Sequence, residues 1–223
     1  MSEFAAYRDR KFVVILAVGR SGSTLLQGLL NALPAYLIRG DNFGFMQGLY
    51  RAHTALERAR NHGGADSPTH SWFGAPELDE AGFAADLAPV VARQLIGGRA
   101  GETHAAIGFK EIRWMDLSGP HETLWGFLNF IEAVFPRAHF ILLTRDIDAI
   151  MKSGWWPLSD TRSMRLGIES FFATARLAPV KRLFEIDYAD LSPDSAPLAA
   201  LCEFLGEQHT PELNAVFELK HGF

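Results

Sequence analysis

The feature that most constrains the fold is a series of short apolar runs that alternate with helix-like segments along the chain. The first run, over residues 12–18, is continuously apolar and rich in β-branched residues, which is typical of a strand buried on both faces of a parallel sheet. Similar runs predict four further strands, over residues 36–39, 105–109, 139–144 and 182–186. The run lengths and the Gly and Pro residues at their ends favour strands over buried helices.

The segments between these strands predict helices. Apolar residues at helical spacing occur over residues 23–33, 45–60, 79–96, 122–135, 147–154, 163–178 and 193–205. The Gly- and Pro-rich stretch 61–76 predicts a long surface loop. Strands that alternate with helices predict an α/β fold of three layers, with a central parallel sheet of about five strands. The 223 residues show no repeat or linker, so we expect a single domain over residues 1–223.

Composition excludes several classes of protein. No apolar run reaches the ~18 residues that span a bilayer, and the first residues lack the pattern of a secretory leader. Cys202 is the only cysteine, so we expect no disulfide and no cysteine-based metal site. The net charge of −5 argues against a general nucleic-acid binder. We therefore expect a cytoplasmic protein, either monomer or homodimer, with no nucleic-acid partner and no metal.

The segment 19–24 has the pattern of an anion-binding loop. Its sequence, Gly-Arg-Ser-Gly-Ser-Thr, lies between the first predicted strand and the first predicted helix. Two glycines allow the backbone N–H groups to face one anion, and the helix adds its positive end. We expect contacts from Arg20, Ser21, Gly22, Ser23 and Thr24. The glycine spacing and the missing Lys differ from a Walker A loop. The alternative is a plain turn with Ser23 as the helix cap.

A second candidate anion site follows the fourth predicted strand. Arg145 comes directly after this strand, and Ser153 lies in the next helical stretch. A guanidinium can bind a phosphate through two hydrogen bonds, and a serine hydroxyl can donate to the same group. Because ligands of parallel sheets bind at the carboxyl ends of the strands, both anion sites are expected at one edge. The alternative is a surface ion pair of Arg145 with Asp146 or Asp148.

Together these motifs resemble those of the sulfotransferase family. The segment 19–24 resembles the family's 5′-phosphosulfate loop, and Arg145 with Ser153 resembles its 3′-phosphate motif. The stretch 187–191, followed by Phe204-Leu-Gly206, resembles the family's Tyr-Glu-Asp-Leu … Phe-Leu-Gly region. The three motifs occur in the family's order over residues 12–206. Arg20 and the stretch Gly-Phe-Lys-Glu-Ile-Arg-Trp at 108–114 are similar to bacterial members.

The resemblance implies the P-loop-like sulfotransferase fold and the activity of a PAPS-dependent sulfotransferase (PAPS is 3′-phosphoadenosine 5′-phosphosulfate). The product of the donor would be 3′-phosphoadenosine 5′-phosphate (PAP), and no metal is implied. By position, the loop 19–24 would hold the 5′ end of the donor. Arg145 and Ser153 would hold its 3′-phosphate, and Tyr188 would lie near the adenine. The Lys-x-His pattern of eukaryotic members is absent, because residues 110–113 read Lys-Glu-Ile-Arg.

Transfer to an acceptor hydroxyl requires a base. Asp41, which follows the second predicted strand, is the first candidate, and some family members place a catalytic carboxylate here. Glu111 is the second candidate, and His70 and His121 remain. The alternatives are a turn or a helix cap for Asp41 and an ion pair with Arg113 or Lys110 for Glu111.

Charge develops on the departing phosphate during such a transfer, and Arg20 and Lys110 are the side chains expected to stabilise it. Phe43, Trp114 and Trp155 are candidates for the wall of an acceptor site, although aromatic residues also fill cores. The acceptor would be a small molecule or glycan: a carbohydrate, a lipid or a secondary metabolite. Two other interpretations stay open, namely a P-loop-type small-molecule kinase and a non-catalytic nucleotide-binding relative.

Overall fold

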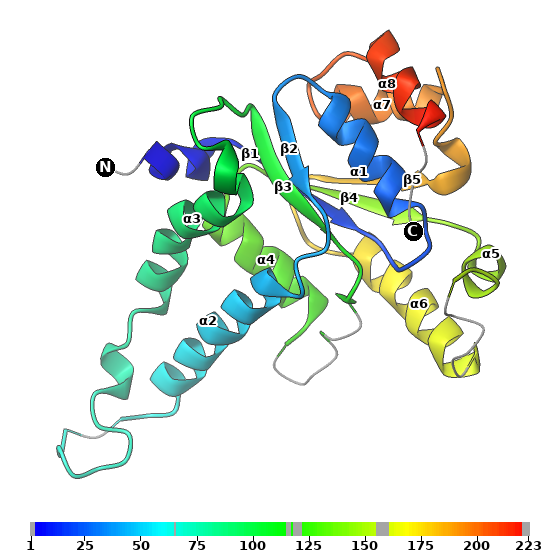
Figure 1. Cartoon of the computed structure of the whole chain (residues 1–223). Helices are drawn as coiled ribbons and strands as arrows, with labels where there is room; N and C mark the ends of the chain where they lie inside the picture. Colours follow the sequence, from blue (N-terminus) through cyan, green and yellow to red (C-terminus); the bar gives the residue numbers. More distant parts are fainter. Residues whose placement is uncertain (1–2, 65, 115–116, 118–121, 155–160, 220–223) are drawn as a thin grey trace.

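The computed structural model describes residues 3–64, 66–114, 117, 122–154 and 161–219, and a parallel sheet of five strands runs through its centre (Figure 1). The strands lie in the order β2-β3-β1-β4-β5, and each neighbouring pair is parallel. Their bounds are β1 Lys11–Leu16, β2 Tyr36–Arg39, β3 Ala106–Glu111, β4 Ala138–Thr144 and β5 Leu183–Asp187. The predicted α/β class and the five-stranded parallel sheet are confirmed.

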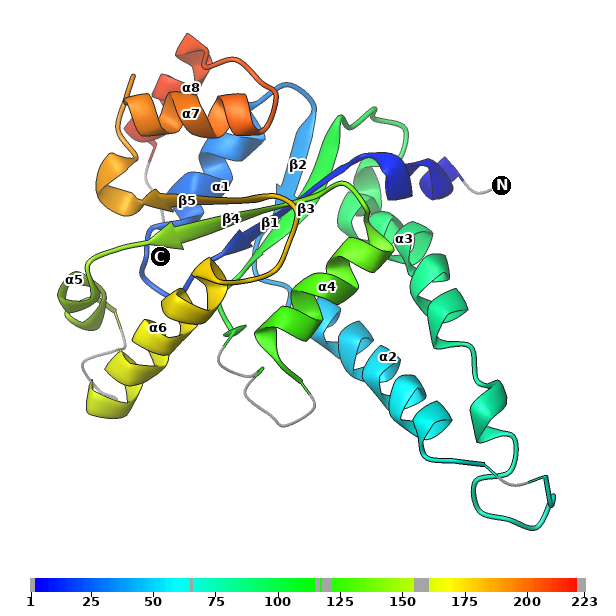
Figure 2. The same cartoon turned by 180° about the vertical axis from the view of Figure 1, so that it is seen from behind.

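Helices cover both faces of the sheet (Figures 1 and 2). The α-helices are α1 Ser23–Ala32, α2 Phe45–Asn61, α3 Glu80–Ile96, α4 Leu124–Val134, α5 Ile147–Met151, α6 Thr161–Arg176, α7 Ala196–Phe204 and α8 Pro211–Ala215. Short 3-10 helices are η1 Glu3–Asp9, η2 Ala75–Glu77, η3 Gly97–Arg99, η6 Tyr188–Asp190 and η7 Val216–Glu218. One face packs against α1, α7 and α8, and the other against α2, α3, α4 and α6.

The alternation of side chains along β1 explains why this strand is apolar throughout. Val13 and Ile15 belong to the core under α1 and α7, whereas Phe12 and Val14 belong to the core on the other face. All four are fully buried, because successive side chains of a strand point to opposite faces. The Phe12 ring stacks on Phe135, with 3.8 Å between the ring centroids.

The register of the sheet brings the carboxyl ends of its central strands to one edge. Leu16, the last residue of β1, pairs with Glu111 at the end of β3 and with Leu142 near the end of β4. The loop that follows β1 therefore emerges between β3 and β4. The residues that follow these strands are the candidates for a functional site.

The helices α2 and α3 form an arm that projects from the sheet (Figures 1 and 2). The segment 62–79 joins them at the far end, where the stretch 61–76 was predicted to form a loop; η2 and turns occupy the described part of it. Asp79 caps α3 by accepting a hydrogen bond from the Gly82 N–H. Pro89 lies inside α3, which continues through it to Ile96. None of the helices in the described ranges is long and apolar enough to cross a membrane.

A polar cluster ties the last helices to the amino-terminal ends of β1 and β2. The Lys11 Nζ donates to the Tyr36 hydroxyl at 2.6 Å and to Glu207 Oε1 at 2.8 Å. The Tyr36 hydroxyl also donates to Glu207 Oε1, at 2.9 Å. Burial and the neighbouring Glu207 carboxylate raise the pKa of Tyr36 above its usual range. This cluster lies at the edge of the sheet opposite the candidate site.

Candidate functional site

The loop after β1 has a backbone that presents N–H groups at the start of α1. Arg20 and Gly22 both adopt left-handed conformations, with φ of 68° and 92°, and Gly22 is the N-cap of α1 without any side-chain cap. The first N–H groups of a helix have no partner within the helix, so they remain available to an anion together with the helix dipole. The Ser21 hydroxyl donates to the Val18 carbonyl at 2.8 Å, which holds the loop to its strand. The alternative in which Ser23 caps the helix does not occur.

Two arginines from different elements converge on this loop. Arg145, directly after β4, donates from Nη1 to the Arg20 carbonyl oxygen at 2.9 Å. The Arg20 Nε donates to the Ser153 hydroxyl at 3.1 Å. Within the described residues neither guanidinium forms an ion pair with a carboxylate. Two half-buried cations without a counter-ion among the described residues make a local positive charge that suits a polyanionic ligand.

Tyr188, in η6, closes one side of this positive pocket. The Arg145 guanidinium lies over its ring, 4.4 Å from the centroid. A Cβ atom at Gly22 would lie 2.1 Å from Tyr188 Cδ2, so the close approach of this ring requires glycine. The pocket has a volume of about 180 Å³ and is lined by Arg20, Gly22, Ser23, Thr24, Leu25, Arg145 and Tyr188. The structure thus brings Arg20, Arg145, Ser153 and Tyr188 together around the loop.

The two acidic residues that could have neutralised Arg145 have other roles. The Asp146 carboxylate accepts from the Ala149 N–H and caps α5. Asp148 forms an ion pair with Arg165 of α6. The surface-pair alternative for Arg145 therefore does not occur, and its charge remains with the loop.

Asp41 lies at the same edge of the sheet, beyond the end of β2. Its Oδ2 accepts a hydrogen bond of 2.7 Å from the Nζ of Lys110, the second-last residue of β3. The lysine side chain is 8% exposed, whereas the aspartate side chain is 38% exposed. The neighbouring Asn42, and not Asp41, accepts from the Phe45 N–H at the start of α2. Asp41 is therefore fixed by a buried cation while part of its side chain is exposed.

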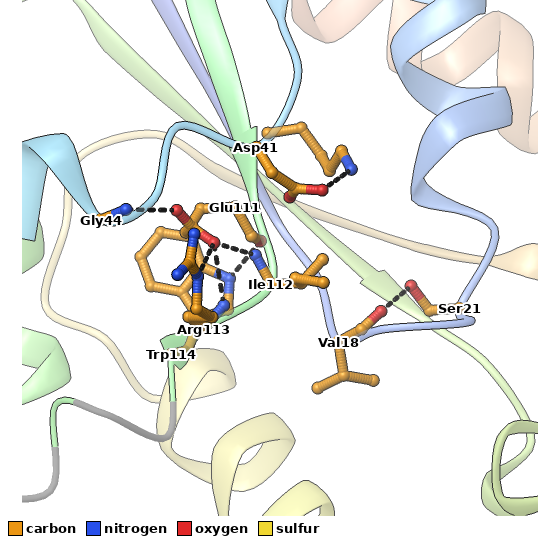
Figure 3. A network of polar contacts seen from close by, with 9 residues as sticks. Val18, Ser21, Asp41, Gly44, Glu111, Ile112, Arg113 and Trp114 are labelled. Atoms are coloured by element: carbon orange, nitrogen blue, oxygen red, sulfur yellow. Dashed lines mark hydrogen bonds and ion pairs between the residues drawn. The ribbon is translucent and has the colours of Figure 1, made fainter. Parts of the chain in front are cut away.

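Glu111 has no exposed surface, and its carboxylate is surrounded by donors (Figure 3). Its Oε2 accepts from the Gly44 N–H at 3.1 Å. Its Oε1 accepts from the Ile112 N–H at 2.9 Å and the Arg113 N–H at 3.1 Å. The Arg113 Nε lies 3.5 Å away, so this ion pair is secondary to three backbone hydrogen bonds. The carboxylate joins the end of β3 to the turn that carries Asp41.

The aromatic candidates differ in their surroundings. Phe43 is 89% exposed, and the Arg113 guanidinium lies over its ring at 4.4 Å. Trp114 is buried, and its Nε1 donates to the Glu111 carbonyl oxygen at 2.6 Å. His70 lies in the segment that joins α2 to α3, where its Nδ1 accepts from the Trp72 N–H at 3.2 Å. Trp155 and His121 lie outside the described residues.

One buried polar residue near this site is not among the site residues predicted from the sequence. Gln47, in the first turn of α2, is 2% exposed. In the described part of the chain, neither its Oε1 nor its Nε2 has a hydrogen-bond partner. A Cβ at Gly44 would lie 3.4 Å from Gln47 Oε1, so this amide adjoins the turn that Glu111 holds. No sequence pattern distinguishes this buried glutamine from the exposed polar residues on the same helix. The described residues contain no group of three or more His, Cys, Asp or Glu side chains that could hold a metal.

A family model described as "Sulfotransferase family" matches residues 13–211. Sulfotransferase STF1 from Mycobacterium tuberculosis H37Rv has 17% sequence identity and a TM-score of 0.49, and the match covers 99% of this chain and 74% of that one. Sulfotransferase STF9 from Mycobacterium avium has 15% identity and a TM-score of 0.43, with coverage of 94% and 67%. No curated protein sequence matches the chain.

Proposed function

The chain belongs to the sulfotransferase family, and we propose that it transfers a sulfuryl group from PAPS to a hydroxyl group of an acceptor. The observation that carries the proposal is the pairing of two kinds of site at one edge of the sheet. A positive pocket surrounds the loop after β1, and a partly exposed carboxylate, Asp41, lies beyond β2. A phosphosulfate donor needs the first, and the removal of a hydroxyl proton needs the second.

The residues around the loop fit a nucleotide that carries phosphates at both ends. The N–H groups of Gly22, Ser23 and Thr24 would bind the 5′-phosphosulfate. Arg145 and Ser153 would bind the 3′-phosphate; Ser153 accepts from Arg20, which leaves its own hydroxyl proton free to donate. The absence of any ion pair for either arginine among the described residues is what such a ligand requires, because its phosphates would supply the missing counter-charges.

The Tyr188 ring, packed against Gly22, would offer its remaining face to the adenine. Stacking between a tyrosine and a base is tolerant of small shifts and stabilises binding by about 1–3 kcal/mol. The 3′-phosphate would then decide the specificity for PAPS over other adenine nucleotides.

The proposed transfer exchanges one sulfur–oxygen bond for another. The bond between sulfur and the bridging oxygen of the 5′-phosphate breaks, and its electron pair stays on that oxygen. A new bond forms between sulfur and the acceptor oxygen, whose proton passes to a base. The products are a sulfate ester and PAP. The transition state of such a transfer is loose, so positioning and charge stabilisation supply most of the catalysis.

Each charged group of the site has a distinct role in this proposal. Asp41 accepts the proton, because it is the carboxylate with exposed surface. Lys110 holds Asp41 in place, and Arg20 stabilises the charge that grows on the departing phosphate. Glu111 is a positioning residue, since its oxygens are occupied by backbone N–H groups.

Calorimetric titration with PAP, and with ADP in parallel, both without Mg²⁺, tests the donor. We expect PAP to bind and Arg145→Ala to weaken it at least about tenfold, because a charged hydrogen bond contributes about 1.5–3 kcal/mol. Arg137→Ala is the matched control, since Arg137 directly precedes the other end of β4 and is exposed. Equal binding of ADP and PAP would favour the kinase interpretation. PAP binding without turnover on any acceptor would favour a non-catalytic relative.

A further inference from the structure

A second cavity, of about 400 Å³, opens between α4 and α6. Its volume falls within the range of small-molecule sites. None of its described lining residues is charged. They combine apolar side chains with a few hydroxyl groups: Trp114, Leu124, Phe171, Thr123, Ser170 and Thr174.

Three hydrogen bonds between residues of the stretches 110–114 and 41–44 lie between this cavity and the proposed acceptor base. Trp114, which lines the cavity, donates from its indole to the Glu111 carbonyl oxygen at 2.6 Å. The Glu111 carboxylate accepts from the Gly44 N–H, three residues beyond Asp41. Lys110, adjacent to Glu111, holds the Asp41 carboxylate. Figure 3 shows Trp114, Glu111, Gly44 and Asp41 grouped at the end of β3.

The chemistry of the lining selects among acceptors. A charged glycan would bring carboxylate or sulfate groups into a cavity whose described lining offers no cation, and burial of an unpaired charge is strongly unfavourable. A ring system with one hydroxyl group would instead pack against the apolar side of the lining, where the Trp114 and Phe171 rings stack on each other with 6.2 Å between their centroids. The hydroxyl groups of Thr123, Ser170 and Thr174 can satisfy only a few polar groups.

We infer that the cavity between α4 and α6 holds the body of the acceptor, and that the acceptor is an uncharged, largely apolar compound with a hydroxyl group, such as a phenol. This inference rests on the proposed function, because it assumes that the bound hydroxyl meets the sulfuryl group near Asp41. It narrows the acceptor from carbohydrates, lipids and secondary metabolites to apolar alcohols and phenols.

The test uses a substitution on α6 that places a large side chain in the cavity. Ser170→Trp introduces an indole into the cavity, and Ala173→Trp places the same side chain on the same helix at an exposed position that does not line it. The probes are 2-naphthol, the disaccharide of N-acetylglucosamine and a heparin tetrasaccharide. Ligand-observed NMR measures binding of each probe, steady-state assays with PAPS measure sulfation, and calorimetry measures PAP affinity.

We expect 2-naphthol to bind and to be sulfated with a higher kcat/KM than either sugar. Ser170→Trp should raise its KM at least tenfold, whereas Ala173→Trp should change it less than twofold. Both variants should bind PAP within twofold of the wild type, which also shows that they are folded.

The inference is overturned if PAP binds but 2-naphthol neither binds nor reacts, if a sugar is the better substrate, or if Ser170→Trp leaves the KM for 2-naphthol unchanged. Failure of the proposed function has a different signature, because PAP would then not bind to the wild type. Binding of 2-naphthol that Ser170→Trp abolishes would in that case still support the cavity as a site for apolar hydroxyl compounds.

Discussion

Glu111→Gln tests whether the Glu111 carboxylate positions the site or takes part in the chemistry. The side chain is fully buried, and three backbone N–H groups donate to its two oxygens. A glutamine can turn its one oxygen toward Ile112 and Arg113, but its NH₂ group then faces the Gly44 N–H. Two donors oppose each other there, and the Gly44 N–H loses its acceptor.

The magnitude follows from these contacts. A buried N–H left without an acceptor costs about 1–3 kcal/mol. The two surviving hydrogen bonds lose the charge of their acceptor, which roughly halves their strength. We therefore expect Glu111→Gln to lower the free energy of unfolding by about 3–5 kcal/mol, which lowers Tm by roughly 10 °C in a domain of this size.

Asp41→Asn is the matched comparison, because it makes the same chemical change in the other carboxylate. The Asp41 side chain is 38% exposed, and an asparagine oxygen can still accept from Lys110. We expect a loss of about 1–3 kcal/mol in the free energy of unfolding, because the buried Lys110 keeps an acceptor but loses its counter-charge. The kcat should fall about 10²–10⁴-fold through loss of the base. Urea unfolding and sulfation kinetics on both variants measure the two effects separately.

The opposite pattern would refute this reasoning. The free energy of unfolding of Glu111→Gln could lie within about 1 kcal/mol of the wild-type value while its kcat falls strongly. In that case the carboxylate does not hold the turn, and Glu111 is the stronger candidate for the base. Wild-type kcat in Asp41→Asn would exclude Asp41 from proton transfer.

Three further changes probe the loop, the cation and the core. Gly22→Ala should weaken PAP at least tenfold by calorimetry, because its Cβ would meet the Tyr188 ring at 2.1 Å and its φ is 92°; unchanged affinity would contradict this packing. Lys110→Met should lower kcat about 100-fold with PAP affinity within threefold, since only the cation beside Asp41 is lost; a wild-type kcat would remove Lys110 from the mechanism. Burial lowers the pKa of His139 from 6.5 to about 4, so between these values the unfolded chain binds a proton that the folded chain does not. From pH 7 to pH 4 the free energy of unfolding of the wild type should therefore fall by up to about 3 kcal/mol more than that of His139→Gln. Equal pH dependence of the two proteins in urea unfolding would contradict this effect of His139.

Apolar patterning predicted the strands well, and its errors have physical causes. The first strand was expected over 12–18, but β1 ends at Leu16. Ala17 and Val18 are as buried as the strand, so their apolar character reflects burial of the loop and not strand pairing. β3 continues to Glu111, past the apolar run, because the charges of its last two residues are satisfied by tertiary partners. The short helix α8 (Pro211–Ala215) is too brief to show a helical period.

Some features of the candidate site are formed by adjacent residues, and others by residues that lie far apart in the sequence. The loop after β1 is encoded by adjacent residues, so its position and its glycines could be predicted from the sequence. From the sequence, Glu111 was predicted to be either a base or a partner in an ion pair. The Gly44 N–H that donates to it belongs to a residue 67 positions away, so no local pattern indicates this hydrogen bond. The cavity between α4 and α6 could not be predicted from the sequence either, since its apolar residues have the same helical spacing as core residues.

The strand order separates the donor half of the proposed site from the half that carries the proposed base. β1 is central in β2-β3-β1-β4-β5, so its loop has β4 and β5 on one side and β3 and β2 on the other. Arg145 and Tyr188 follow β4 and β5, whereas Lys110 and Asp41 belong to β3 and the turn after β2. A group bound at the loop after β1 would therefore lie between a half that carries Arg145 and a half that carries Asp41, the proposed base. Exchange of the acceptor would require changes beside Asp41 and in the cavity between α4 and α6, and variants there should alter KM for the acceptor without altering the affinity for PAP.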